Sequence, residues 1–168
     1  MKYLVLTVFS LLIATTCGAA QPAAEPIRTS VTANGLVAAL YVPAGAHGRL
    51  PGIIILGGSE GGMGKPTARD GRLIAQRGYA VLQLAYFDAP GLPKDLALIP
   101  VEYFKTAIDW LRTRPDVDPD RIGIVGGSIG GEVALTVASH YREIRAVVAT
   151  MPSSVVWPGI IHAPGDPP

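Results

Sequence analysis

In the segment Gly126-Gly127-Ser128-Ile129-Gly130, glycines on both sides of a serine leave its hydroxyl room to project. The segment matches the pattern G-x-S-x-G, in which the serine occupies a strained turn between a strand and a helix. The glycines let the two elements approach closely, so the hydroxyl projects into the site. We therefore predict that Ser128 is a nucleophile that attacks a carbonyl carbon and becomes acylated.

Attack on a carbonyl creates a negatively charged oxygen that backbone N–H groups must stabilise. The predicted turn directs the N–H of Ile129 toward this oxygen, and the dipole of the following helix favours the charge. A second donor is expected from the Gly-rich loop at 57–62, where Ser59 is the first candidate and Glu60 the second. The sequence thus predicts an oxyanion hole built from two loops that are far apart in the chain.

A serine hydroxyl needs a base, usually a histidine that a carboxylate orients. Of the three histidines, His47 precedes a predicted strand and is expected at the end of the sheet opposite the site. His140 is expected about 18 Å from Ser128 along a helix. His162 follows the last predicted strand and is the remaining candidate base, with a solvated Pro- and Gly-rich tail as the alternative.

In proteins with this motif, the acid and the histidine follow the nucleophile in chain order, on loops after later strands. The sequence after Ser128 is long enough for one helix, one strand and a tail. We therefore expect this chain to lack the triad Asp and His and to be at most a weak catalyst alone. We also expect a sheet that is incomplete on its C-terminal side, with an exposed apolar edge at 145–149.

Apolar runs and helix signals alternate along the chain. Strands are predicted at 27–33, 36–42, 52–56, 80–84, 122–125 and 145–149, and helices at 67–77, from Pro100 to Pro115, and at 129–139. Asn34-Gly35 is expected to form a tight hairpin turn. In the first helix, Leu73 and Ile74 are expected to face the core. The second helix carries an apolar stripe formed by Val101, Phe104, Ile108 and Leu111.

The alternation of strands and helices indicates a three-layer α/β fold with a mostly parallel sheet. A chain of 168 residues, 49% hydrophobic and 16% charged, has the composition of a single globular domain. We assign that domain to residues 21–168. The alternative for both Gly-rich segments is that they are only tight turns of such a sheet.

Two other kinds of binding site are disfavoured by the sequence. A phosphate loop fails on spacing, because Gly64-Lys65 is preceded at the required distance by Ser59 and followed by Pro66. With 14 basic and 13 acidic residues and a net charge of +1, no run of like charge predicts nucleic-acid binding. No cofactor is expected, and the only cysteine, Cys17, leaves no pair for a disulfide or a cysteine metal site.

The first 20 residues have the order of a secretory signal peptide, with Lys2, an apolar stretch at 3–14 and small residues up to Ala20. Cleavage after Ala20 predicts an exported protein, periplasmic or secreted. The apolar stretch falls below the roughly 20 residues that span a bilayer, so we expect no stable membrane span after cleavage. A buried N-terminal helix and lipid attachment at Cys17 are the alternatives.

Four stretches together resemble a known family: LPGIIILGGSEGG, GYAVLQLAYFDAPGLPKDLALIPVEYFKTAIDWL, VDPDRIGIVGGSIGGEVAL and AVVATMPSSVVWPG. They resemble the C-terminal domain of the acyl-CoA thioesterase and bile acid-CoA:amino acid N-acyltransferase family. The resemblance covers residues 50–159. It implies an α/β-hydrolase-type three-layer sandwich, and the segments FDAPGLP and IPVEYF favour this family over dienelactone hydrolases of the same architecture.

The resemblance implies an acyl-enzyme at Ser128 and a small-molecule acyl thioester or ester as substrate. Family members with cysteine at this position tend to conjugate amino acids, whereas serine members tend to hydrolyse, so Ser128 points to water as the acyl acceptor. The chain departs from the family in its signal peptide, in the absence of a separate N-terminal β-domain, and in having no counterpart of the downstream Asp and His. A non-catalytic α/β domain and a carboxylic ester hydrolase or peptidase remain open alternatives. The sequence leaves the oligomeric state undetermined.

Overall fold

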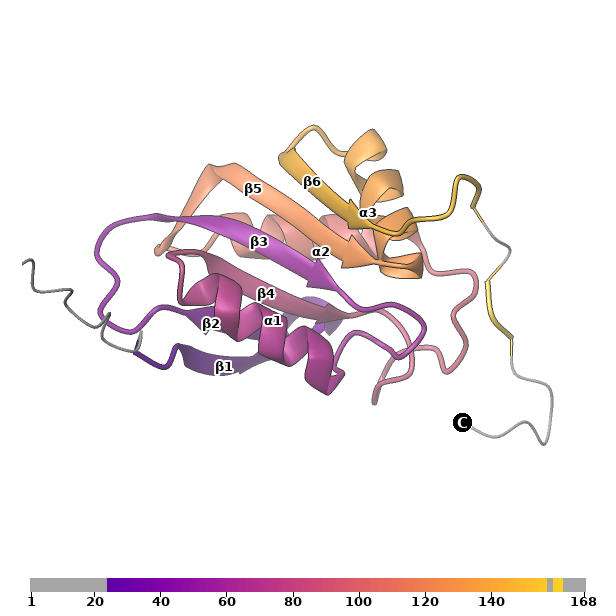
Figure 1. The fold of residues 1–168 in the computed structure, drawn as a ribbon, viewed down its shortest axis with the longest axis horizontal. Helices are drawn as coiled ribbons and strands as arrows, with labels where there is room; N and C mark the ends of the chain where they lie inside the picture. The colour runs from indigo at the N-terminus through magenta and orange to yellow at the C-terminus, as the bar shows by residue number, and fades with distance from the viewer. Residues whose placement is uncertain (1–23, 157–158, 162–168) are drawn as a thin grey trace, which may run out of the picture.

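A computed structural model describes residues 24–156 and 159–161, which form one six-stranded sheet with helices on both faces (Figure 1). The strands are β1 (Ile27–Val31), β2 (Val37–Val42), β3 (Leu50–Leu56), β4 (Ala80–Ala85), β5 (Val117–Gly127) and β6 (Ile144–Thr150). The helices are α1 (Lys65–Ala75), α2 (Val101–Arg112) and α3 (Ile129–His140). The signal peptide predicted at 1–20 and the candidate base His162 lie outside the described residues.

The strands lie in the order β1-β2-β4-β3-β5-β6. The pairs β4/β3, β3/β5 and β5/β6 are parallel, whereas β1/β2 and β2/β4 are antiparallel. The mostly parallel sheet expected from the alternating pattern is therefore confirmed. The carboxyl ends of β3, β4, β5 and β6 lie at the same end of the sheet, so the loops that follow them come together there. Ligands bind at this end in folds of this kind.

The N-terminal hairpin forms where Asn34-Gly35 predicted it. Both residues have positive φ, 57° and 75°, as a tight reversal requires. The turn is a short 3₁₀ segment (Ala33–Gly35), so β1 ends earlier than expected and Ala33 belongs to the turn. Among residues 24–156 and 159–161, β1 pairs only with β2, and it places Val31 opposite Ala38.

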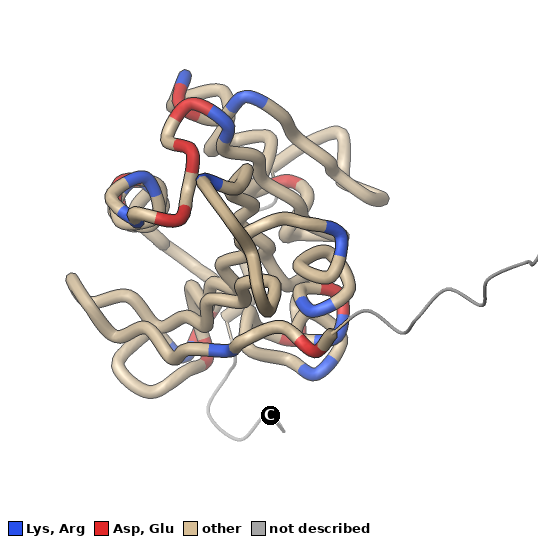
Figure 2. The backbone as a smooth tube through the Cα atoms, turned by 90° about the vertical axis from the view of Figure 1, so that its left-hand side faces the viewer, with Lys and Arg blue, Asp and Glu red and all other residues tan. Residues whose placement is uncertain are grey.

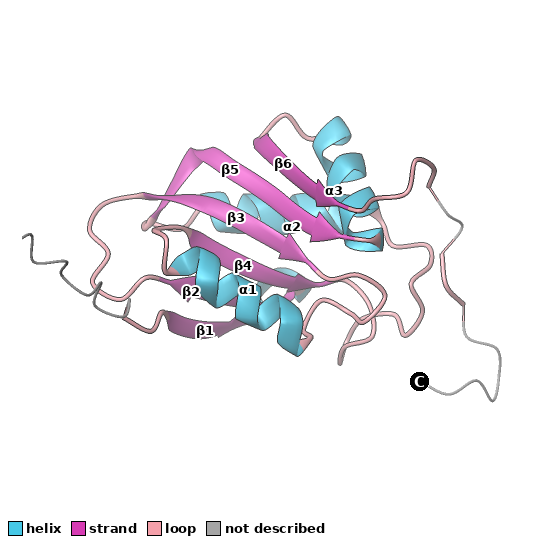
Figure 3. Cartoon of the chain, in the orientation of Figure 1, coloured by secondary structure: helices cyan, strands magenta, loops and turns pink. Residues whose placement is uncertain are grey.

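Helices cover the two faces of the sheet and bury two separate cores (Figure 3). Helices α2 and α3 pack on one face, where the predicted stripe of α2 is confirmed by the burial of Phe104, Ile108 and Leu111. Helix α1 packs on the other face with a smaller core around Tyr41. This arrangement confirms the three-layer α/β architecture.

The inward face of α1 differs from the sequence expectation at Leu73, whereas Ile74 packs against the core as expected. Leu73 is 43% exposed, whereas Thr67, Gly71 and Ala75 are buried. These three residues repeat every four positions and form a narrow small-residue face, on which Gly71 would place a Cβ only 3.4 Å from the Tyr41 ring. The bulk of Tyr41 on the sheet thus decides that small residues rather than Leu73 face inward.

The last strand forms the apolar edge that the sequence predicted. Within the described residues, β6 pairs only with β5. On β6, Val147 and Val148 are 37% and 54% exposed. In the described part of the chain, no helix is long and apolar enough to cross a membrane.

The charged residues are mixed in sign over the surface. Figure 2 shows Lys and Arg positions interspersed with Asp and Glu positions on the face that it presents. Several of these charges pair locally, as Lys105 does with Asp109 at 2.6 Å one helical turn away. On that face, no continuous basic stripe follows any one element.

Candidate active site

Ser128 occupies a strained turn at the carboxyl end of β5. Its φ of 53° and ψ of −127° lie in a region that residues with a side chain rarely adopt. Its N–H donates a 2.9 Å hydrogen bond to the carbonyl of Thr150, and its own carbonyl accepts one from the N–H of Gly131 at 2.9 Å. These two bonds connect the turn to β6 and to the first turn of α3, so the strain is held by both neighbours.

Glycines allow the strand, the turn and the helix to come together. A Cβ on Gly130 would collide with the carbonyl oxygen of Gly57 at the end of β3, and one on Gly126 would collide with the carbonyl of Gly130. Gly127 is different, because a Cβ there would find only the Thr150 carbonyl, 4.0 Å away. The motif thus requires glycine at 126 and 130 for close packing.

The loop between β3 and α1 brings Gly58 next to the nucleophile. The point where Gly58 would carry a Cβ lies 3.5 Å from Cβ of Ser128 and 2.8 Å from Oε2 of Glu60. The Gly58 N–H donates to Oε1 of Glu60 at 3.1 Å. The glutamate carboxylate is therefore folded over the loop beside Ser128.

The predicted oxyanion donors come from the two segments that the structure brings together. Ile129 begins α3, and the first N–H groups of a helix have no partner within the helix. Ser59 is exposed in the opposing loop, one residue beyond Gly58. The roles of Ile129 and Ser59 as donors remain predictions, and the structure adds Gly58 as the loop residue in contact range of Ser128.

Two side chains of β4 and its following loop hold the 57–62 loop at its two ends. Tyr86 donates a 2.6 Å hydrogen bond to the carbonyl of Gly57, and Gln83 donates one of 2.9 Å to the carbonyl of Gly62. Burial raises the pKa of the Tyr86 phenol well above its usual range, and the carboxylates of Glu60 and Glu132 raise it further. Tyr86 therefore stays protonated and keeps donating.

Sequence reasoning missed Tyr86 and Gln83 as supports of the site. For Gln83 the signal was available, because it is the one polar residue within the apolar strand AVLQLA. A buried amide must find partners, and Gln83 accepts from the Tyr41 hydroxyl at 2.9 Å as well as donating to the loop. Tyr86 gave no comparable signal, since an aromatic after a strand is ordinary core.

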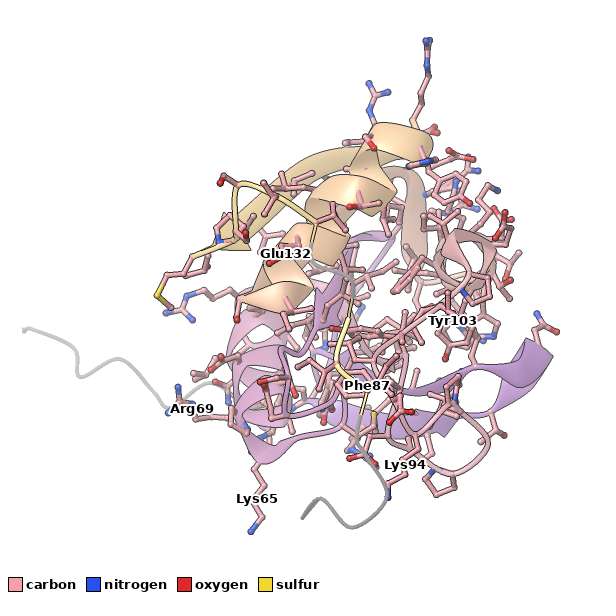
Figure 4. All side chains as sticks on the ribbon, turned by 90° about the vertical axis from the view of Figure 1, so that its right-hand side faces the viewer. Lys65, Arg69, Phe87, Lys94, Tyr103 and Glu132 are labelled. Atoms are coloured by element: carbon pink, nitrogen blue, oxygen red, sulfur yellow. The ribbon has the colours of Figure 1, made fainter. Side chains whose placement is uncertain are left out.

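Ser128 opens into a cavity of about 340 Å³ on the α1 side of the sheet. Its wall includes the carboxylates Glu60 and Asp70, and Met151, whose φ of 50° marks another strained position at a strand end. In Figure 4, which faces the carboxyl ends of the strands, Lys65 and Arg69 extend outward from α1 at the margin of this region. The cavity has room for a substrate group next to the hydroxyl.

The histidines of the described residues lie away from this cavity, as expected. His47 lies in the loop before β3, at the end of the sheet opposite the Ser128 turn. His140 ends α3, where its Nδ1 lies 2.9 Å from the carbonyl of Thr136. In the described part of the chain, the ionisable groups lining the Ser128 cavity are Glu60 and Asp70.

Comparisons with known proteins identify the family to which this chain is similar. Residues 99–163 match the family described as BAAT / Acyl-CoA thioester hydrolase C terminal. Acyl-coenzyme A thioesterase 1 of Mus musculus is 39% identical over 121 residues, which are 72% of this chain and 28% of that protein. Mitochondrial acyl-coenzyme A thioesterase 2 of Homo sapiens is 34% identical over 142 residues, covering 84% of this chain and 28% of that protein.

A transferase is found alongside these hydrolases. Bile acid-CoA:amino acid N-acyltransferase of Mus musculus is 36% identical over 121 residues, covering 72% of this chain and 28% of that protein. The chain thus spans less than a third of the length of each of these relatives.

Solved structures agree on the fold. A hypothetical protein from Pseudomonas aeruginosa superposes with a TM-score of 0.63 at 26% identity, covering 87% of this chain and 49% of that one. A thermostable carboxylesterase cloned from a metagenomic library gives a TM-score of 0.56 at 26% identity, covering 80% and 49%. The chain has an α/β-hydrolase fold and belongs to the acyl-CoA thioesterase and bile acid-CoA:amino acid N-acyltransferase family.

Proposed function

We propose that this chain carries the nucleophile and oxyanion loops of a hydrolase that cleaves an acyl thioester or ester. The observation that carries the proposal is the left-handed backbone of Ser128 at the end of β5, pressed against the Gly58 loop. This geometry exposes a hydroxyl beside the start of α3 and the 57–62 loop, the two segments that we propose supply the backbone donors for acyl transfer to serine. The family of the chain supports the same reaction class.

In the proposed reaction, Ser128 Oγ bonds to the acyl carbon while its proton passes to a base. The C–S or C–O bond then breaks, and the leaving thiol or alcohol takes that proton. Water next attacks the acyl-enzyme, transfers a proton through the base to Oγ, and releases the carboxylic acid. The N–H of Ile129 and the donor of the 57–62 loop stabilise the negative oxygen in both steps.

Among the described residues, we identify no base that could take the proton of Ser128. We propose that this chain alone turns over slowly, since loss of triad members leaves only about 10³- to 10⁴-fold acceleration over water. The test compares the purified chain with a version extended by the C-terminal part of a complete relative. Fluorophosphonate labelling of Ser128 and ester hydrolysis are measured in both. Rapid labelling and full turnover by the unextended chain would contradict slow turnover and would make His162 the first residue to mutate.

Hydrolysis is separated from acyl transfer by adding an amine. With a serine nucleophile, we expect octanoyl-CoA and p-nitrophenyl octanoate to be cleaved equally well with or without glycine or taurine. Ser128→Ala should abolish turnover. Product analysis that finds acyl-glycine or acyl-taurine forming faster than free acid would overturn the assignment to a hydrolase.

An ester in place of a thioester is the second candidate substrate. It is favoured by the likeness to a carboxylesterase at 26% identity and by the signal-peptide order of the first 20 residues, because coenzyme A is mainly an intracellular carrier. The discriminating measurement is the ratio of kcat/KM for octanoyl-CoA to that for p-nitrophenyl octanoate. A ratio well below one assigns the ester class.

We further propose that the protein is exported and that its mature form begins at Gln21. Lys2, the apolar stretch at 3–14 and the small residues before Gln21 support this cleavage. N-terminal sequencing of exported protein is the test. Recovery of an intact Met1 on cytoplasmic protein would rule the proposal out, and a lipid on Cys17 would replace it with an anchored form.

A further inference from the structure

We infer that the apolar part of the acyl group binds in a second cavity, on the α2–α3 side of the Ser128 turn. This inference rests on the proposed function, which supplies the acyl group. The cavity has a volume of about 220 Å³. Ile129, the residue that follows the nucleophile, forms part of its wall. We call this space the acyl cavity and the one containing Ser128 and Glu60 the leaving-group cavity.

The wall of the acyl cavity is mainly apolar and comes from four parts of the fold. Helix α2 supplies Val101 and Phe104, and α3 supplies Ile129, Val133 and Val137 along one face. The loop before α2 and the segment after β6 complete it with Leu96, Leu98, Ile99, Val156 and Gly159. The last two parts are joined where the Ile160 N–H donates to the Leu96 carbonyl at 2.9 Å. An alkyl chain in this space would leave water, the main source of its binding free energy.

The two cavities are lined by consecutive residues of the nucleophile turn. Ser128 lines the leaving-group cavity, and Ile129 lines the acyl cavity. An acyl carbonyl bonded to Ser128, with its oxygen at the Ile129 N–H, therefore has one substituent directed to each side. The alkyl chain takes the side with the mainly apolar wall, and the leaving group takes the other side.

Glu132 adds selectivity to the acyl cavity. It lies in the first turn of α3, lines the cavity, and is near enough to Tyr86 for its charge to raise the pKa of that phenol. Among the described residues its carboxylate has neither a hydrogen bond nor an ion pair. An unpaired negative charge in an apolar wall repels a second carboxylate, so acyl groups that end in a carboxylate are disfavoured.

The first test fills or enlarges the cavity at Val133. Val133→Phe should lower the ratio of kcat/KM for p-nitrophenyl octanoate to that for p-nitrophenyl acetate by about tenfold, since several CH₂ groups return to water. Val133→Ala should raise the preference for longer chains. The matched control is Leu135→Phe, on the same helix at a side chain that is 46% exposed. An unchanged ratio in Val133→Phe, or an equal fall in Leu135→Phe, would overturn the inference.

A binding test does not depend on turnover. Decanoate and decanedioate are titrated into Ser128→Ala by calorimetry, with circular dichroism as the check on folding. We expect decanoate to bind at least tenfold more tightly than decanedioate. Glu132→Gln should reduce this difference in affinity. Adding Val133→Phe to Ser128→Ala should weaken the binding of decanoate. Binding of both acids with equal affinity would overturn the role of Glu132, and decanoate binding unaffected by Val133→Phe would overturn the cavity assignment.

The two tests separate this inference from the proposed function. If neither the wild-type chain nor its C-terminally extended version cleaves an ester, but decanoate binds and Val133→Phe weakens that binding, the cavity assignment stands and the hydrolase proposal fails. If esters are cleaved through Ser128 but the Val133 variants leave chain-length preference unchanged, the reverse holds.

Discussion

The Gly58 N–H donates a 3.1 Å hydrogen bond to Oε1 of Glu60, while Gly58 itself lies against Ser128. A side chain of the loop thus closes on the backbone of the same loop at the point where an oxyanion donor is needed. Tyr86 holds the carbonyl of the preceding Gly57 from the other side. The loop is therefore fixed by side-chain hydrogen bonds and by its contact with Ser128, which makes these bonds the natural targets for mutation.

Glu60 should act as a positioning residue. Glu60→Ala removes the acceptor of the Gly58 N–H, and a hydrogen bond to a charged group is worth about 1.5–3 kcal/mol. We expect kcat/KM for ester hydrolysis to fall by about tenfold or more, with little change in KM. Glu60→Gln keeps an oxygen acceptor and should retain most of the activity. Equal losses in both variants would instead show that the charge itself matters.

The backbone strain at Ser128 should lower the free energy of unfolding, so relieving it should make the protein more stable. Ser128→Gly removes the Cβ at a φ of 53° and relieves strain of about 1–3 kcal/mol, of which part is offset by the greater freedom of the unfolded chain. Urea unfolding should find this variant about 1 kcal/mol more stable than Ser128→Ala, which keeps the Cβ. Both variants should be inactive. A glycine variant no more stable than the alanine variant would show that the turn is unstrained.

Substitution by alanine should destabilise the protein at one glycine of the motif and have little effect on stability at another. Gly130→Ala places a Cβ against the Gly57 carbonyl, so β3 and α3 must separate and the variant should lose about 3 kcal/mol or more. Gly127→Ala meets only the Thr150 carbonyl at 4.0 Å and should fold normally. Thermal unfolding followed by circular dichroism compares the two. Similar melting temperatures would contradict the close packing described for Gly130.

The raised pKa of Tyr86 makes stability depend on pH. In the folded protein the phenol stays protonated above its ordinary pKa of 10.0, whereas in the unfolded chain it ionises there. The unfolded state therefore binds fewer protons above pH 10.0, and stability is lost as pH rises beyond this value. Tyr86→Phe removes this dependence but leaves the Gly57 carbonyl without its donor, which costs about 1–3 kcal/mol at pH 7. Urea unfolding at pH 7 and pH 10.5 tests both effects. Tyr103, whose pKa is also raised by burial, remains in both proteins, so the difference in slope reports Tyr86.

Local sequence was sufficient for the elements and for the strained serine. The turn at Ser128 depends on small residues within two positions of it, and the positive φ at Asn34 and Gly35 depends on those two residues alone. The stripe on α2 appears in the sequence because helical periodicity is a local property. These features involve neighbours in the chain, so composition and spacing predict them.

Only the tertiary structure decided what lies beside these elements. The exposure of Leu73 depends on Tyr41 of β2, and Gly58 lies beside Ser128 because a loop about 70 residues earlier in the chain packs there. Tyr86 and Gln83 support the site because β4 pairs between β2 and β3, and the acyl cavity forms where α2, α3 and the segment after β6 meet. Such contacts join segments whose separation in sequence carries no periodic signal, so the residues alone predicted a nucleophile and a fold, while the folded sheet determined the site's shape and supports.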